Sequence, residues 1–158
     1  MAESPNSFFR ALKLMHNSFL LGMVIFLAVA FFVVRTDAVN AEEFRSLDRI
    51  LQVVSVIVSI ASLVIGFRIF KNKILQVRND GGSAIKRANS YKASCIIWWA
   101  MIEGPGILAI VFFILTTNYA FFALGCFHIL ILGVFMPKKE NIIVLLNLKE
   151  SEVAELGG

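Results

Sequence analysis

Residues 96–136 read IIWWAMIEGPGILAIVFFILTTNYAFFALGCFHILILGVFM, and this stretch decides the fold. Glu103 is its one formally charged side chain, and the polar triplet 116–118 is its main interruption. A membrane-spanning helix needs about 20 apolar residues. The stretch therefore predicts two spans, 96–116 and 119–136, and the short break between them predicts an antiparallel hairpin.

Two further apolar runs, 18–34 and 50–67, precede this hairpin. Irregular backbone cannot face lipid, so each run is expected to be a helix. The chain of 158 residues is 58% hydrophobic and 16% charged, whereas soluble domains carry about 25% charged residues. We therefore expect an all-α, polytopic membrane protein: four transmembrane helices as two hairpins within residues 1–136, followed by a short cytoplasmic amphipathic tail, 137–158.

The basic residues set the expected orientation. With both termini in the cytoplasm, twelve Lys and Arg lie inside and three outside, as the positive-inside rule demands. These residues flank apolar runs and do not cover an aromatic-rich soluble surface, so the lipid bilayer is the expected partner and nucleic acid is not.

The first run has an alternative interpretation as a secretory signal that ends at the small residues Val39, Asn40 and Ala41. Its roughly 17 residues exceed the usual 7–15 of a signal core, which favours a span. Whether residues 1–41 are cleaved stays open at this stage.

Apolar residues continue at helical spacing after the second run, up to the turn sequence 79–82, and Ser83 can cap the next helix. This predicts a cytoplasmic helical extension between the second and third spans, projecting about 15 Å at 1.5 Å per residue. Its basic residues could meet anionic lipid or an acidic partner, or could serve only to orient the chain.

The tail begins at Pro137, which predicts a helix boundary or a kink. The apolar patch 142–146 predicts a short helix at the membrane interface, and the residues after it suffice for one or two helical turns.

Glu103 is the first candidate for a proton- or ion-binding site, because it lies about 4–5 Å from the centre of the third span at 1.5 Å per residue. The following Gly104, Pro105 and Gly106 predict a helix kink, since proline removes the amide that would bond the Met101 carbonyl. Freed carbonyls beside a carboxyl group are similar to the discontinuous helices of transporters. A neutral, hydrogen-bonded structural acid is the other interpretation.

His128 and Ser59 lie at similar depth and are the candidate partners of Glu103. His128 could act in a proton relay or simply pack as a neutral ring. Two potential ligands are too few for zinc, which takes three or four, so no metal site is expected.

Small and polar residues also follow one face of the second span at spacings of three and four. This face is expected either to pack against another helix, within the bundle or in a homo- or hetero-oligomer, or to line a pathway with hydroxyls. Its members are Gln52, Ser55, Ser59, Ser62 and Gly66.

No nucleophile–base pair, phosphate-binding loop or metal-ligand cluster is recognisable, so we expect neither enzymatic activity nor a cofactor. Cys95 and Cys126 lie in apolar stretches and are expected to be free thiols.

The stretch KASCIIWWAMIEGPGILAIVFFILTTN (92–118), together with PKKENIIVLLNL (137–148), resembles a family of uncharacterised small four-helix inner-membrane proteins of Bacteroidota. The resemblance implies a bacterial inner-membrane location and supplies no activity. A fainter similarity to the c-type proteolipids of rotary ATPases would give Glu103 a proton-binding role. In place of that family's repeated glycines, however, the second span carries serines, and the cytoplasmic extension is longer.

Two functions therefore remain as hypotheses. One is a non-enzymatic membrane subunit or scaffold that assembles through helix packing, with an intramembrane Glu103 site. The other is a proton- or cation-coupled translocation component in which Glu103 titrates.

Overall fold

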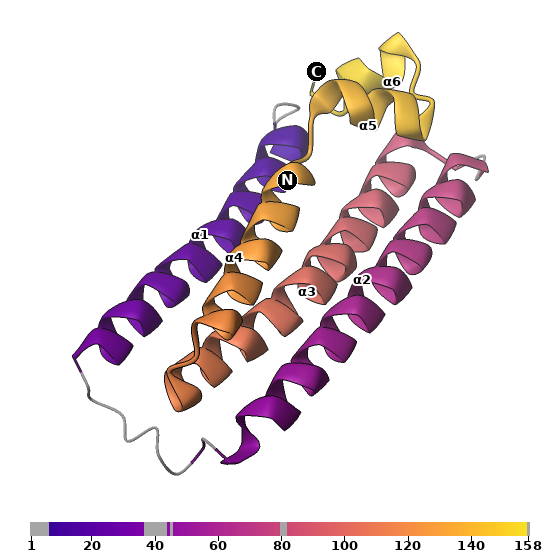
Figure 1. Ribbon diagram of the computed structural model, residues 1–158. Coiled ribbons are helices and arrows are strands. Elements are labelled where there is room, and N and C mark those ends of the chain that lie inside the picture. Colours follow the sequence, from indigo (N-terminus) through magenta and orange to yellow (C-terminus); the bar gives the residue numbers. More distant parts are fainter. Residues whose placement is uncertain (1–6, 37–43, 45, 80–81, 158) are drawn as a thin grey trace.

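The computed structural model describes residues 7–36, 44, 46–79 and 82–157, and regular structure in these ranges is entirely helical (Figure 1). The expected all-α class is confirmed. The described residues form six α-helices in chain order: α1 (Ser7–Arg35), α2 (Asp48–Asn79), α3 (Ala84–Thr116), α4 (Tyr119–Val134), α5 (Lys139–Leu146) and α6 (Glu150–Glu155).

Three of these helices, α1, α2 and α3, are long and apolar enough to cross a membrane. α4 has 16 residues, about 24 Å at 1.5 Å per residue, and so is shorter than the hydrocarbon core of about 30 Å. α4 qualifies only together with α5, and the two helices are bent by 69°. The chain is a multi-pass integral membrane protein with three to four candidate spans.

The surface of the bundle is apolar where a soluble protein would be polar. On α2 the outward side chains are aliphatic, with Ile57 60% and Ile60 58% exposed. The inward positions Ser55, Ser59 and Gly66 are small and buried. Exposed apolar area on this scale indicates a hydrocarbon environment.

α3 is the central helix, because it packs against α1, α2 and α4. Glycines occur where α3 approaches two of these helices. A Cβ atom at Gly66 on α2 would lie 2.8 Å from Cβ of Met101, and one at Gly106 on α3 would lie 2.9 Å from Cβ of His128 on α4. Glycine at these points lets the helix backbones meet.

Capping residues mark where α3 begins and ends and where α4 begins. Ser83 Oγ accepts a hydrogen bond from the Lys86 amide at 3.4 Å, so the predicted cap of α3 is confirmed. Thr117 adopts a left-handed conformation with φ of 53° and ends α3, and Asn118 caps α4 by accepting from the Ala120 amide at 2.9 Å. The predicted antiparallel hairpin of α3 and α4 is thus confirmed (Figure 1).

The helical extension beyond the second run is also confirmed, since α2 continues to Asn79. Residues 80–81 of the predicted turn lie outside the described residues, as do residues 39–41 of the alternative cleavage motif.

The chain after α4 folds over one end of the bundle. α4 stops at Val134 before Pro137, which confirms the predicted boundary, and α5 and α6 contact α2 and α3 respectively. The N-terminal end of α1, the end of α2, the start of α3 and α6 all lie at this end, which we call the terminal end (Figure 1).

Candidate functional site

The centre of the bundle contains a buried polar pair that joins α4 to α2. His128 is 0% exposed, and its Nε2 lies 3.0 Å from Oγ of Ser59. Its Nδ1 is buried and has no hydrogen-bond partner in the part of the chain that the structure describes. Close contact with Gly106 holds the histidine against α3, so the pair is part of a tightly packed helix junction.

Glu103 does not join this pair. The structure records no hydrogen bond to its half-buried side chain from any described residue, and Ser59 and His128, the partners considered for it, bind each other instead. The reason is rotational: Ile102, Pro105 and Gly106 occupy the inward face of this turn of α3, which leaves Glu103 at the edge of that face beside exposed Gly104.

The Gly104–Pro105–Gly106 segment does not interrupt the helix. α3 runs continuously from Ala84 to Thr116 with Pro105 inside it. Proline removes one backbone hydrogen bond, and packing against three neighbouring helices holds the remainder of α3 in place. The helix is therefore continuous through this segment, and the predicted kink at Pro105 stays a prediction.

The polar face of α2 is turned toward the bundle. Near its start, Asp48 Oδ2 accepts hydrogen bonds from Gln52 Nε2 at 3.4 Å and from Asn118 Nδ2 at 2.7 Å. Further along, Ser55 is buried and its Oγ has no partner within the described ranges, while Ser62 is half-buried. Buried polar atoms thus occur on this face from the start of α2 to the His128–Ser59 pair.

Sequence reasoning missed His16, which precedes the predicted first span. The residue is 0% exposed, its Nε2 lies 2.9 Å from the Leu132 carbonyl oxygen, and its ring meets the Trp99 ring edge-on at 5.0 Å. Its spacing from Leu12 and Met23, four and seven residues, is the signal that could have placed it on the inward face of α1.

Arg87 is one of the basic residues of the predicted extension, which were expected to meet lipid or to orient the chain. The structure buries it instead, with 8% of the residue exposed. It donates to the Leu146 carbonyl oxygen at 2.9 Å and forms an ion pair with Glu152. The hydrogen bond from the Lys149 amide, and after it Arg87, lower the pKa of the Glu152 carboxyl. Arg87 therefore anchors α5 and α6 to the start of α3, and it is not available to lipid headgroups.

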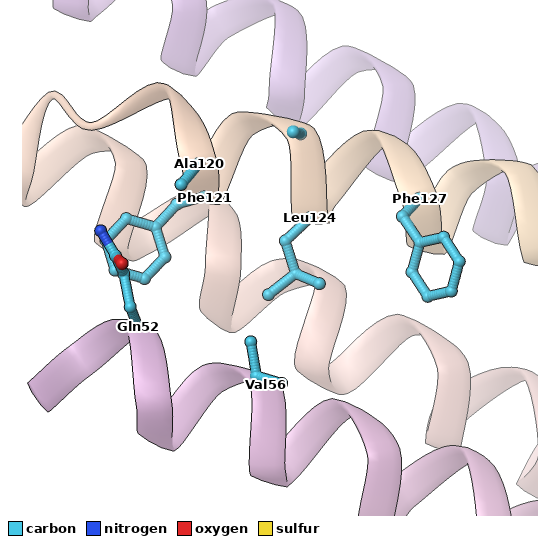
Figure 2. A pocket seen from close by; sticks show the side chains of 7 residues that line it. Gln52, Val56, Ala120, Phe121, Leu124 and Phe127 are labelled. Carbon is cyan, nitrogen blue, oxygen red and sulfur yellow. The ribbon is translucent and has the colours of Figure 1, made fainter. Parts of the chain in front are cut away.

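Cavities lie at the edges of the bundle. A groove of about 310 Å³ separates α2 from α4, and Figure 2 shows Val56 and Leu124 pointing toward each other across it. A second cavity of about 290 Å³ lies at the terminal end, beneath α5. Neither cavity is lined by Glu103, His128 or Ser59.

Cys95 and Cys126 are free, as expected. Within residues 7–36, 44, 46–79 and 82–157, the structure holds no group of three or more His, Cys, Asp or Glu side chains that could bind a metal ion.

Comparisons with protein-family models, with curated proteins and with solved structures find no match to this chain. The fold and the apolar surface therefore identify only the broad class, an all-α integral membrane protein. Its central helix, α3, is partly exposed on its outer side.

Proposed function

We propose that the protein is a non-enzymatic subunit of a membrane assembly. It crosses the bacterial inner membrane four times with both termini in the cytoplasm, and it associates with another transmembrane helix through the outer side of α3. The observation that carries the proposal is the Glu103 carboxyl, which lies in the middle of an apolar helix at the surface of the bundle, without a hydrogen-bond partner among the described residues.

The residues around Glu103 suit helix association. Ala100, Gly104 and Ile107 are exposed on the same side of α3, and a Cβ atom at Gly104 would meet nothing within 4 Å. Ala100 and Gly104 are four residues apart, the small-xxx-small spacing that lets two transmembrane helices approach closely. We call Ala100, Glu103, Gly104 and Ile107 the outer face of α3.

A neighbouring helix would supply what Glu103 lacks. A polar side chain left in hydrocarbon gains roughly 0.6–1.7 kcal/mol from an interhelical hydrogen bond. A second copy of the chain would present the same carboxyl across a two-fold axis, and two neutral acids can exchange hydrogen bonds. A polar residue of a different subunit would serve the same purpose.

The test compares Gly104→Leu with Gly22→Leu. Both glycines are exposed, and a Cβ atom at either would meet nothing within 4 Å, so the leucine side chain enters open space at its first atom in both variants. We expect wild type and Gly22→Leu to form assemblies in lipid, counted by single-molecule photobleaching, and Gly104→Leu to dissociate. A monomeric wild type, or equal behaviour of the two variants, would contradict the proposal.

A proton- or cation-coupled translocation component is the second candidate. The unpartnered buried atoms Ser55 Oγ and His128 Nδ1 favour it, because polar groups inside a bundle can line a path. Glu103→Gln separates the two functions, since glutamine keeps the hydrogen-bonding capacity and cannot titrate. If Glu103→Gln assembles normally and loses ion-linked transport in vesicles, the translocation role holds; unchanged ion flux excludes it.

A further inference from the structure

The cavity at the terminal end has the features of a ligand site separate from the outer face of α3. It has a volume of about 290 Å³ and lies between α3, the end of α4 and α5. Aromatic side chains form much of its wall, among them Phe70, Tyr91, Trp98 and Phe135. Apolar walls with a few polar groups are typical of small-molecule and lipid sites.

Trp98 is one of the residues that line this cavity, and its indole N–H is an unsatisfied hydrogen-bond donor. The residue is 3% exposed, and its ring is held by Phe70, stacked at 6.2 Å, and by Phe135, edge-on at 5.2 Å. Its Nε1–H is buried without an acceptor among the described residues. The indole is a hydrogen-bond donor only, so a ligand that brings an acceptor oxygen would satisfy it.

The charge of the lining indicates the kind of acceptor. Among the residues that the structure describes, Lys138 is the only charged one that lines the cavity and no acidic one lines it, while Asn141 adds a further amide donor. Lys138 and Asn141 are both exposed, so they can reach a ligand from the aqueous side. This donor set favours an anion that has several oxygen atoms.

The other side of the cavity is continuous with the apolar surface of the bundle. Val134 and Leu145 line it and are 80% and 38% exposed. A ligand that satisfies both sides carries an anionic head and an apolar tail. We propose that this cavity binds one anionic phospholipid, whose phosphate oxygens accept hydrogen bonds from Trp98 Nε1–H and Lys138 and whose acyl chains lie along Val134 and Leu145.

Free phosphate has the same acceptor oxygens as the headgroup but has no acyl chain to contact Val134 and Leu145. We therefore assign the cavity to a lipid. The site also differs from general attraction of anionic lipid by the basic residues of the α2–α3 extension. It uses one lysine beside an aromatic cavity, and its occupancy depends on that lysine in particular.

The first experiment uses the fluorescence of Trp98 and Trp99, the two tryptophans of the chain. The full-length protein is placed in mixed vesicles that contain either brominated phosphatidylglycerol in phosphatidylcholine or the reverse. We expect brominated phosphatidylglycerol to quench at the lower mole fraction. Lys138→Gln should weaken this preference about fivefold, which corresponds to ~1 kcal/mol per lysine near a membrane surface.

Lys139→Gln is the matched control. Lys139 is the next residue and has the same charge, but its Nζ lies 5.7 Å from the Phe9 ring and it does not line the cavity. The preference for phosphatidylglycerol should survive in this variant. Equal quenching by the two brominated lipids in wild type, or equal losses in Lys138→Gln and Lys139→Gln, overturns the proposal.

A second readout isolates the indole donor. Trp98→Phe keeps an aromatic ring and removes the N–H, and native mass spectrometry then counts the phosphatidylglycerol molecules retained after delipidation. We expect one retained lipid in wild type and at least a tenfold lower occupancy in Trp98→Phe. Should Trp98→Phe fail to fold, Lys138→Gln in the same assay decides.

Competition with inorganic phosphate tests whether the site recognises the whole lipid or only its anionic group. Excess phosphate should leave the phosphatidylglycerol bound, because it cannot replace the acyl contacts. If inorganic phosphate displaces the lipid, or binds wild type in phosphatidylcholine vesicles as strongly as phosphatidylglycerol does, the site recognises the anion alone and the lipid assignment is wrong.

Discussion

Gly104 and Gly106 lie two residues apart on α3, and the same substitution should have opposite effects at the two positions. Alanine is favoured over glycine inside a helix by roughly 0.5–1 kcal/mol. At Gly104 the added Cβ meets nothing within 4 Å, so Gly104→Ala should stabilise the isolated protein by about this amount. At Gly106 the Cβ would lie 2.3 Å from Met23 Cε and 2.9 Å from His128 Cβ.

The Met23 methyl group is the end of a flexible chain, but Met23 is only 1% exposed and has little room to move. The His128 Cβ can move only if α4 shifts. Overpacking of this kind costs about 1–3 kcal/mol. Because the helix preference is common to both variants, Gly106→Ala should be less stable than Gly104→Ala by about 1–3 kcal/mol.

Reversible unfolding in mixed detergent micelles, followed by tryptophan fluorescence, measures this difference. A Met23→Ala background removes the shorter of the two contacts and should reduce the cost of Gly106→Ala without abolishing it. Equal stability of Gly106→Ala and Gly104→Ala would refute the inference that α3 and α4 meet backbone to side chain at this point.

Two further outcomes are expected. Ser59→Ala should lower the unfolding free energy by roughly 0.6–1.7 kcal/mol, because it removes the hydrogen bond to His128 within a membrane bundle. Ser62→Ala, at a half-buried position on the same face, should lower it by less in the same unfolding assay. The second outcome concerns pH, because the pKa of Glu152 lies below its ordinary value of 4.5. The stabilisation that the ionised Glu152 carboxylate provides is complete above pH 4.5 and is lost as the pH falls through the lowered pKa. Hydrogen exchange of α5 and α6 should therefore accelerate as the pH falls through this range. Glu152→Gln should show the faster exchange already at neutral pH and no such transition; an unchanged exchange rate would show that the ion pair with Arg87 does not hold the two helices.

The helices could be predicted because their signals are local. Apolar runs long enough for a membrane define α1, α2 and α3, and the polar triplet 116–118 breaks the third run from the fourth. Ser83 and Pro137 mark ends that the structure reproduces within a few residues. Such features depend on hydrogen bonding and solvation of a few consecutive residues, and both can be read from one short segment.

The partners of the polar side chains could not be predicted in the same way. Depth along a span placed Ser59, His128 and Glu103 at one level, but contact also depends on how each helix is rotated about its axis. That rotation is set by the packing of all neighbours together. It pairs His128 with Ser59 and leaves Glu103 outside. It also buries His16 and Arg87, which the sequence places in flanking segments.

Rotation about the helix axis also gives the Glu103–Gly106 segment two roles within one turn of helix. Successive residues of an α-helix point about 100° apart, so one turn of the central helix faces both the bundle and its surroundings. Gly106 faces inward, where only glycine admits His128 and Met23. Gly104 faces outward and leaves the Glu103 carboxyl accessible to a neighbouring helix. The sequence Glu-Gly-Pro-Gly therefore serves two separate purposes: the interior packing of the bundle and, under the proposed function, the approach of a partner helix. Substitutions at Gly106 should change the stability of the bundle, and substitutions at Gly104 should change its assembly.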